Sequence, residues 1–258
     1  MGKKLKIALV QTSIIWENPP ANRALLTLKI EQISADTDVI ILPEMFTTGF
    51  TMRPENIAIE EGQKTIDWMV KIATEKQMAV MGSVPFFEEP TFFNRLFFVQ
   101  PNGLLSFYDK RHTFTLAGET DVYTAGRQKL ILDYKGFKIC PLICYDLRFP
   151  VWSRNIEAYD ILIYVANWPR PRIAAWDTLL KARAIENMTY CIGVNRIGED
   201  ALGYEYPGHS AAYDALGKSL VFSNIEEVVY TTLNKQHLIS TRNKLKFLAD
   251  KDQFTLTI

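Results

Sequence analysis

The feature that most constrains the fold is a succession of short apolar runs separated by segments of helical period. Among the runs of strand length are Lys6–Gln11, Asp38–Leu42, Ala79–Val84, Phe92–Gln100, Phe137–Ile143, Asp160–Val165 and Thr189–Asn195. The longest segments of helical period are Ala21–Ser34, Gln63–Lys76 and Ile173–Asn187. Strands that alternate with helices in this way are typical of layered α/β proteins. We therefore predict a layered α/β fold with no internal repeat.

All three predicted helices have apolar stripes that we expect to face the core. In the first helix the stripe consists of Leu25, Leu28 and Ile33. In the second helix the stripe consists of Ile66, Met69, Val70 and Ala73. In the third it consists of Ala175, Leu179, Ala182 and Ile185. Two further segments are predicted with less regular structure: a short helix over Val151–Glu157 and a glycine-rich loop over Ala201–Gly208.

Composition excludes several classes of protein. The chain of 258 residues is 48% hydrophobic, which is enough for a large core and too apolar for disorder. Its 29 basic and 29 acidic residues balance, so nothing indicates binding to nucleic acid or to an anionic membrane. No apolar run approaches the roughly 18 residues of a membrane-spanning helix, and we expect a cytoplasmic protein. Its three cysteines do not suggest a disulfide framework.

Three reactive residues follow three of the apolar runs: Glu44, Lys110 and Cys144. Strand ends at one edge of a sheet can converge, so these residues form one candidate site. Cys144 lies between a strand and a helical turn, where a thiol can ionise and act as a nucleophile. We predict that Glu44 is the general base and that Lys110 stabilises the thiolate and then an oxyanion, together with the backbone N–H of Tyr145.

The residues around these three positions form motifs that resemble a known family. The motifs are Leu42-Pro43-Glu44-Met45-Phe46, Tyr108-Asp109-Lys110-Arg111-His112 and Ile143-Cys144-Tyr145-Asp146-Leu147-Arg148-Phe149-Pro150. In order and spacing they resemble the catalytic blocks of the nitrilase superfamily of carbon–nitrogen hydrolases. The segments Thr47-Thr48-Gly49-Phe50, Ala166-Asn167-Trp168-Pro169 and Ala182-Arg183-Ala184-Ile185-Glu186-Asn187 are similar to the omega-amidase branch, whose members hydrolyse the terminal amide of 2-oxoglutaramate and 2-oxosuccinamate.

The resemblance implies a four-layer α-β-β-α sandwich formed by a single domain over residues 1–258. It implies a small amide as substrate, no metal or other cofactor, and a homodimer or higher homo-oligomer. It also implies a second glutamate that helps to orient the lysine and the substrate amide, and Glu119 matches that residue by its place in the loop after Lys110. We expect the C-terminal tail, residues 244–258, to dock on a partner subunit rather than to form an edge strand.

Recognition of an oxo-acid amide requires a partner for its carboxylate. A guanidinium suits this task because it binds a carboxylate with two hydrogen bonds. Arg172 is our candidate and Arg170 the second choice, with Phe114, Tyr145 and Trp168 as walls of a small pocket. We expect Arg148 to be structural and to pair with an acidic residue near Cys144.

Three other readings remain open. The same mechanism would serve a nitrile, an N-carbamoyl compound or another small amide. A Cys–His hydrolase would use His112 or His209, and we favour it less because His112 belongs to the segment of Lys110 and His209 lies in a glycine-rich loop. A binding protein with a vestigial site would be expected to have lost one of the four catalytic positions, and all four are present. A metal site is disfavoured because the three histidines and three cysteines lack ligand spacing.

Overall fold

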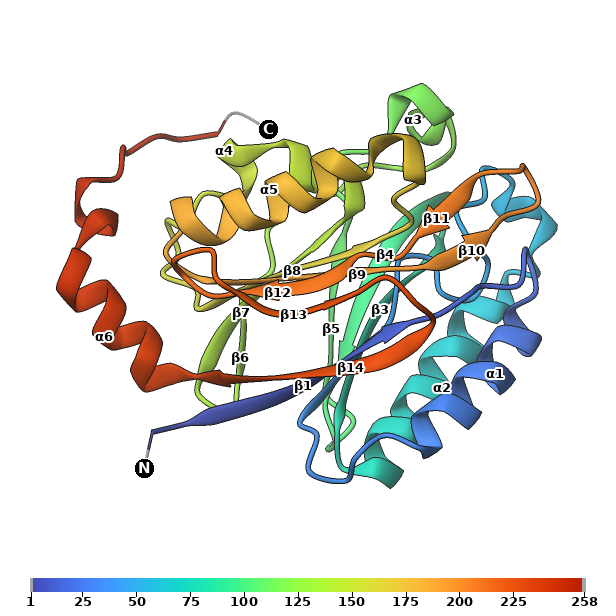
Figure 1. Ribbon diagram of the computed structural model, residues 1–258. Coiled ribbons are helices and arrows are strands. Elements are labelled where there is room, and N and C mark those ends of the chain that lie inside the picture. The colour runs from blue at the N-terminus through green and yellow to red at the C-terminus, as the bar shows by residue number, and fades with distance from the viewer. Residues whose placement is uncertain (1, 257–258) are drawn as a thin grey trace.

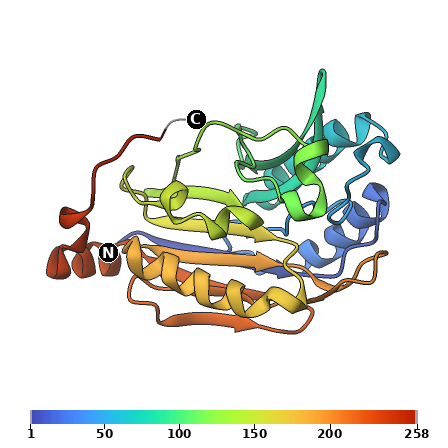
Figure 2. The ribbon, with the colours of Figure 1, turned by 90° about the horizontal axis from the view of Figure 1, so that it is seen from above.

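The computed structural model describes residues 2–256, which form four layers in the order helix, sheet, sheet, helix (Figure 1). Helices α1 (Pro19–Glu31) and α2 (Glu60–Lys76) cover the outer face of one six-stranded sheet. Helix α5 (Ile173–Glu186) covers the other sheet and runs alongside its strands when seen from above (Figure 2). The predicted α-β-β-α sandwich is confirmed.

The first sheet contains the strands that lead to Glu44 and Lys110. Its order is β14 (Glu227–Asn234), β1 (Lys4–Gln11), β2 (Val39–Ile41), β3 (Ala79–Glu88), β4 (Thr91–Val99) and β5 (Leu105–Asp109). Strands β1, β2 and β3 are parallel, while β14, β4 and β5 join as antiparallel neighbours. Strand β4 runs antiparallel to β3, and β5 runs antiparallel to β4. Strand β5 therefore runs in the same direction as β2, and both strands end at the same edge of the sheet.

The second sheet contains the strand that leads to Cys144. Its order is β13 (Ser219–Ser223), β12 (Ser210–Tyr213), β9 (Tyr190–Asn195), β8 (Ile161–Ala166), β7 (Phe137–Ile143) and β6 (Leu132–Tyr134). Strands β7, β8 and β9 are parallel, so their carboxyl ends share an edge. The remaining helices are α3 (Glu119–Val122), α4 (Pro150–Ser153) and α6 (Lys235–Leu245).

Side chains alternate between two cores along the central strands of the first sheet, as the two-residue period of a strand requires. On β1, Leu5, Ile7 and Leu9 point into the core between the sheets, whereas Ala8 and Val10 face α1 and α2. The apolar runs are nearly continuous because both faces of each sheet are covered. The result is two sheets that are held in fixed positions relative to each other.

The stripe predicted for the second helix is confirmed at Ile66, Met69 and Ala73, which are buried in α2. The stripes predicted for the first and third helices are shifted by about one residue, although Ile33 is buried as predicted. In α1, Leu26 and Ile30 are buried and Leu28 is 60% exposed. In α5 the buried residues are Trp176, Leu180, Arg183 and Ala184, while Ile185 is 46% exposed. Both helices contain adjacent leucines, so two neighbouring stripes are equally apolar, and packing against the sheet selects between them.

Two short elements also differ from the predictions. Helix α4 ends at Ser153, because the next residue, Arg154, is extended. The predicted loop 201–208 contains a strand: β10 (Ile197–Glu199) pairs with β11 (Glu205–Pro207) as a hairpin. Within residues 2–256, no helix has the length and apolar character needed to cross a bilayer.

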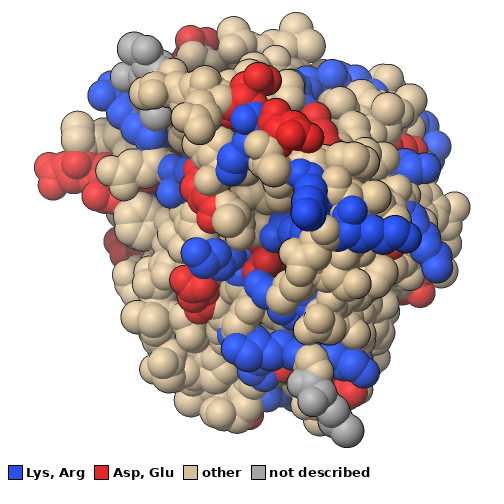
Figure 3. All heavy atoms as spheres, turned by 90° about the vertical axis from the view of Figure 1, so that its left-hand side faces the viewer, with Lys and Arg blue, Asp and Glu red and all other residues tan. Residues whose placement is uncertain are grey.

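Helix α6 and the tail lie on the side of the molecule shown in Figure 3, where basic and acidic side chains are interspersed. Two basic residues of α6, Lys235 and Arg242, pair with the buried carboxylate of Asp160. The tail crosses the outside of its own subunit, where Lys251 Nζ donates to Asn155 O at 3.3 Å and Leu256 lines a small surface cavity. The last two residues of the predicted docking segment lie outside the described residues.

Candidate active site

The structure brings together the four residues predicted to be catalytic. Glu44 follows β2, Lys110 follows β5, Cys144 follows β7 and Glu119 begins α3. The Lys110 Nζ lies 2.8 Å from Glu44 Oε1 and 2.8 Å from Glu119 Oε2, and these three side chains are buried. The charges of Glu44 and Lys110 both act on the Cys144 thiol. Residues from both sheets therefore meet at one site.

Lys110 is a fixed cation between two carboxylates. Burial alone would lower its pKa, but the negative charges of Glu119 and Glu44 outweigh burial and raise the pKa of Lys110 above its ordinary value. Burial also raises the pKa of Glu119, with Lys110 opposing the shift and Glu44 adding to it. The ammonium lies 5.1 Å from the centre of the Phe50 ring, which is within the range of a cation–π contact.

The orientation of Glu44 is fixed by two asparagines. Asn94 Nδ2 donates to Glu44 Oε1 at 2.8 Å and also to Glu119 Oε1 at 3.1 Å. The backbone N–H of Asn167 donates to Glu44 Oε2 at 2.8 Å, and Asn167 Nδ2 donates to the Glu44 carbonyl oxygen at 2.7 Å. The carboxylate thus has a defined position before any substrate binds, as a general base requires.

Cys144 has a strained backbone and lies beside charged groups that act on its thiol. Its φ is 43°, a left-handed conformation that is rare for residues other than glycine and tends to occur at functional sites. Burial and the negative charge of Glu44 raise the pKa of the thiol well above 9.0, and Lys110 only partly opposes this.

The backbone N–H of Tyr145 is available to a ligand at this site. A 3₁₀ helix over Cys144–Arg148 begins at Cys144 itself. The first N–H groups of a helix have no acceptor within the helix, and Tyr145 is the second residue of this one. An oxygen bound next to Cys144 can therefore accept a hydrogen bond from this backbone group.

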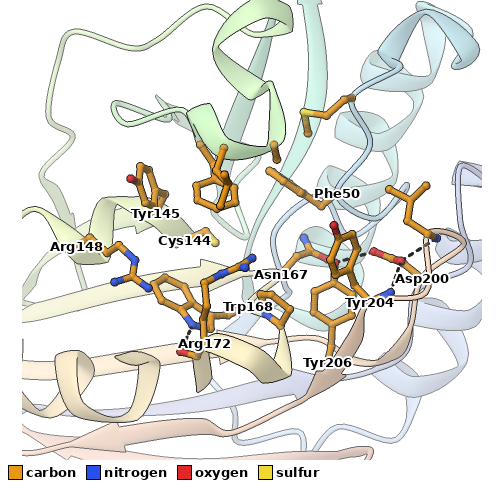
Figure 4. A pocket seen from close by; sticks show the side chains of 16 residues that line it. Phe50, Cys144, Tyr145, Arg148, Asn167, Trp168, Arg172, Asp200, Tyr204 and Tyr206 are labelled. Atoms are coloured by element: carbon orange, nitrogen blue, oxygen red, sulfur yellow. Dashed lines mark hydrogen bonds between the residues drawn. The ribbon is translucent and has the colours of Figure 1, made fainter. Parts of the chain in front are cut away.

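A cavity of about 200 Å³ opens beside Cys144 (Figure 4). All four predicted substrate-binding residues line it: Phe114, Tyr145, Trp168 and Arg172. Phe114 and Tyr145 pack edge to face with ring centres 4.8 Å apart, and the Trp168 indole donates to the Arg172 carbonyl oxygen at 2.7 Å. The cavity is small and contains both polar and aromatic groups, which suits a compact polar ligand.

The three candidate arginines have different environments. Arg172 lines the cavity with its guanidinium 5.2 Å from the Phe114 ring. Arg170 is exposed and pairs with Glu205 at 2.6 Å, so the second choice does not reach the cavity. Arg148 was expected to pair with an acidic residue. Instead it lines the cavity and stacks 5.0 Å from Trp168, with no ion pair within residues 2–256.

Sequence reasoning missed most of the outer wall of the cavity. Phe50 and Met52 come from the loop before α2, and Leu202, Tyr204 and Tyr206 come from the β10–β11 hairpin. The hairpin is held by Asp200, which accepts hydrogen bonds from the backbone of Leu202 and Tyr204 and from the Tyr206 hydroxyl. A pair of tyrosines in a glycine-rich segment was the only signal for this wall.

The two histidines weighed for a Cys–His hydrolase lie elsewhere. His112 Nδ1 faces Asp146 Oδ1 at 2.8 Å, and His209 Nδ1 faces Asp177 at 3.0 Å. Of the described residues that line the cavity beside Cys144, none is a histidine. The group beside the thiol that can accept its proton is Glu44, so the geometry does not support a Cys–His pair.

The chain is similar to characterised hydrolases along almost its whole length. A model of the carbon–nitrogen hydrolase family matches residues 6–243. The chain is 41% identical to omega-amidase YafV of Yersinia enterocolitica over 254 residues, which cover 98% of each chain. It is 31% identical to 2-oxoglutaramate amidase of Bacillus subtilis, with 96% of this chain and 97% of that one covered.

Solved structures show the same architecture. The CN-hydrolase superfamily protein XC1258 from Xanthomonas campestris, which carries an arsenic adduct in its active site, superimposes with a TM-score of 0.95 at 40% identity. The match covers 98% of this chain and 99% of that one. Nit3 of Saccharomyces cerevisiae, at 22% identity, has a TM-score of 0.82 with 94% of each chain covered, which extends the likeness of fold to a distant relative.

Proposed function

This chain belongs to the carbon–nitrogen hydrolase family, and from that premise we propose that it is an omega-amidase that uses Cys144 as its nucleophile. Its substrates are the monoamides of small 2-oxo-dicarboxylic acids, 2-oxoglutaramate and 2-oxosuccinamate. The observation that carries the proposal is the buried cluster of Glu44, Lys110 and Glu119 beside the Cys144 thiol, in a cavity that also contains the Arg172 guanidinium.

The first half-reaction begins with a proton transfer inside the cluster. The thiol proton of Cys144 moves to Glu44, which leaves the net charge of the cluster unchanged and therefore suits a buried site. The sulfur attacks the amide carbon, and the oxyanion that forms is stabilised by the Lys110 ammonium and the Tyr145 N–H. Glu44 then gives its proton to the amide nitrogen, the C–N bond breaks, ammonia leaves and a thioester remains on Cys144.

The second half-reaction hydrolyses the thioester. Glu44, again ionised, removes a proton from a water molecule, which attacks the thioester carbon. The same two donors stabilise the second oxyanion. When this intermediate collapses, the C–S bond breaks, the carboxylic acid is released and the proton held by Glu44 returns to the Cys144 sulfur. No redox step or metal ion is needed for this balance of atoms and charge.

Selectivity for an oxo-acid amide comes from Arg172. Its guanidinium lines the same cavity as the thiol, and in Figure 4 it lies on the Cys144 side of the Trp168 indole, with Arg148 on the other side of the ring. A charge-assisted hydrogen bond to a carboxylate contributes about 1.5–3 kcal/mol. Arg172 therefore binds the substrate carboxylate. This contact favours substrates in which the distance from the carboxylate to the amide carbon brings that carbon to Cys144.

The test is an ammonia-release assay with 2-oxoglutaramate, 2-oxosuccinamate, a neutral amide of similar size and a small nitrile. We expect kcat/KM to be highest for the two oxo-acid amides, and Cys144→Ala to abolish the activity while the fold is kept. Arg172→Ala should lower kcat/KM for the oxo-acid amides by roughly 10- to 100-fold and change it less than about twofold for the neutral amide.

Arg170→Ala is the matched control, because it removes the same charge two residues away from a side chain that pairs with Glu205 on the surface. If Arg170→Ala and Arg172→Ala reduce the activity equally, Arg172 does not bind the carboxylate. If the nitrile or the neutral amide is the better substrate for the unmodified protein, the assignment as an omega-amidase is wrong.

We further propose that the chain acts as a single domain and that two or more copies assemble, with the tail at the interface. The support is the course of the tail, which runs across the outside of the fold, where Lys251 Nζ donates to Asn155 O and Leu256 packs against the core. Removal of residues 247–258 should shift the mass measured by light scattering toward that of a monomer. An unchanged oligomeric mass would exclude the tail from the interface.

A further inference from the structure

We propose that Asp146 is a positioning residue that fixes the distance between Lys110 and Cys144, and that Tyr108 and His112 are its partners on the side of the lysine. The inference rests on the proposed function, because the reaction needs these two groups at a defined separation. It concerns a carboxylate that has no place in the chemical steps above.

A single carboxylate ties together the two segments that carry the lysine and the nucleophile. Asp146 Oδ2 accepts from the Ile143 N–H at 3.0 Å and from the Tyr108 hydroxyl at 2.8 Å. Asp146 Oδ1 accepts from the His112 backbone N–H at 2.9 Å and faces His112 Nδ1 at 2.8 Å. Tyr108 and His112 lie two residues to either side of Lys110, and Asp146 lies two residues after Cys144.

The partners of Asp146 are themselves held in place. Asp146 is fully buried and Tyr108 is 1% exposed. The Tyr108 oxygen accepts from Trp152 Nε1 at 3.1 Å, and burial together with the charge of Asp146 raises the pKa of Tyr108, so the hydroxyl remains a donor. The His112 ring stacks on Phe149 with centres 3.7 Å apart and planes 3° apart.

This arrangement explains how a strained nucleophile is kept in place. A left-handed non-glycine residue persists only when its surroundings determine its conformation, and Asp146 fixes the backbone immediately before Cys144 through Ile143. The same carboxylate fixes the backbone after Lys110 through His112. Because a misplacement of about 1 Å at a reacting centre can cost roughly 100-fold in rate, weakening this link should lower catalysis without weakening substrate binding.

The first test is Asp146→Asn, which keeps the shape but turns one acceptor into a donor. We expect kcat for 2-oxoglutaramate to fall by about 10- to 100-fold and KM to change less than about twofold. Asp177→Asn is the matched control, since Asp177 also accepts from a histidine, His209, at 3.0 Å but lies outside the cavity. It should leave kcat unchanged.

A second measurement separates an effect on the position of Lys110 from an effect on the stability of the fold. The rate at which iodoacetamide alkylates Cys144, measured against pH without substrate, reports the charges that face the thiol, which are Glu44, Lys110 and Glu119. In His112→Ala, which leaves the charge of Asp146 in place, the lysine is held less closely, so the profile should shift to higher pH. Leu26→Ala, a core change in α1, should lower the melting temperature without shifting the profile.

Substitutions of His112, a partner of Asp146, test the same proposal if Asp146→Asn does not fold. His112→Ala should lower kcat, and His112→Asn, whose side chain can donate in place of Nδ1, should restore part of it. Unchanged kcat per folded molecule in Asp146→Asn, or unchanged kcat together with an unchanged alkylation profile in His112→Ala, would overturn the proposal. If the wild type hydrolyses none of the amides, the proposed function fails, while the alkylation profile still tests the role of Asp146.

Discussion

Replacing Glu119 by glutamine tests how the site holds its cation. Both carboxylate oxygens of Glu119 contact Lys110 Nζ, at 3.0 and 2.8 Å. The first also accepts from Asn94 Nδ2 and the second from the Phe114 N–H. Whichever way a glutamine side chain is turned, its NH₂ group therefore faces the ammonium and one further donor.

The size of the effect follows from this count of donors. Each buried donor without an acceptor costs about 1–3 kcal/mol, so two of them should lower the free energy of unfolding by about 2–6 kcal/mol. For a chain of this size the melting temperature should fall by roughly 5–20 °C. At temperatures where the variant is folded, the displaced ammonium no longer faces the oxyanion, and kcat should fall by about 100-fold or more.

The assays are thermal unfolding and ammonia release from 2-oxoglutaramate at a temperature well below the transition. Glu61→Gln is the control: Glu61 pairs with Arg23 and Lys64 on the helical layer, so this change removes a charge far from Lys110. An activity and a melting temperature close to those of the wild type in Glu119→Gln would refute the reasoning, because Lys110 would then not depend on Glu119.

Three further perturbations test neighbouring parts of the account. Gly126→Ala would place a Cβ 2.1 Å from the Asp109 carbonyl oxygen, so it should displace the Lys110 segment and reduce both melting temperature and kcat. Asn94→Ala removes a donor shared by Glu44 and Glu119, and kcat should fall about tenfold, as measured by ammonia release. Burial raises the pKa of Cys140 and Cys191, so above pH 9 the unfolded chain loses thiol protons that the folded chain keeps. These two thiols should therefore lower the free energy of unfolding by up to ~2.7 kcal/mol for each pH unit above 9. The free energy of unfolding, measured by denaturant titration at several pH values above 9, should fall less steeply with pH when both cysteines are replaced by alanine. An equal dependence on pH would contradict this.

The layers of the fold and the strands that lead to the site are predictable from sequence because apolar runs of strand length stand out. The faces of the helices are predictable only in part: the expected face of α2 is buried, but that of α5 is not, and α5 shows why. Its sequence has apolar residues on several sides, and the stripe through Trp176 and Leu180 is buried in place of the one through Ala175 and Leu179. The periodicity identifies the helix, but only the packing of Trp176 against the sheet selects the face.

The candidate site divides in a similar way. Glu44, Lys110 and Cys144 are recognisable because each is a reactive residue placed directly after an apolar run. Asn94 has no such context: it lies beside Arg95 inside a strand rich in phenylalanine, and its task, to donate to two carboxylates, exists only when β4 lies beside both. The direction in which the pKa of the Cys144 thiol is shifted is not readable from the sequence either, since it depends on the balance between burial, Glu44 and Lys110 in space.

Arg148 illustrates a third kind of error. A charged residue near a buried turn is usually paired with an opposite charge, and that expectation is reasonable for an arginine next to Asp146 in sequence. In the structure, the acceptors of Asp146 are occupied by Tyr108, His112 and Ile143, so Arg148 turns to Trp168 and the cavity. Competition for a single carboxylate is not visible in a sequence.

Detection of an acyl-enzyme on Cys144 is the decisive measurement for the proposed mechanism. The protein is mixed with 2-oxoglutaramate, quenched in acid during turnover and digested, and the peptide that contains Cys144 is examined by mass spectrometry. The account predicts an acyl group attached to Cys144 through a thioester, released by hydroxylamine and absent from Cys144→Ala. Ammonia release by Cys144→Ala at the rate of the wild type, or an acyl group on another residue, would contradict it.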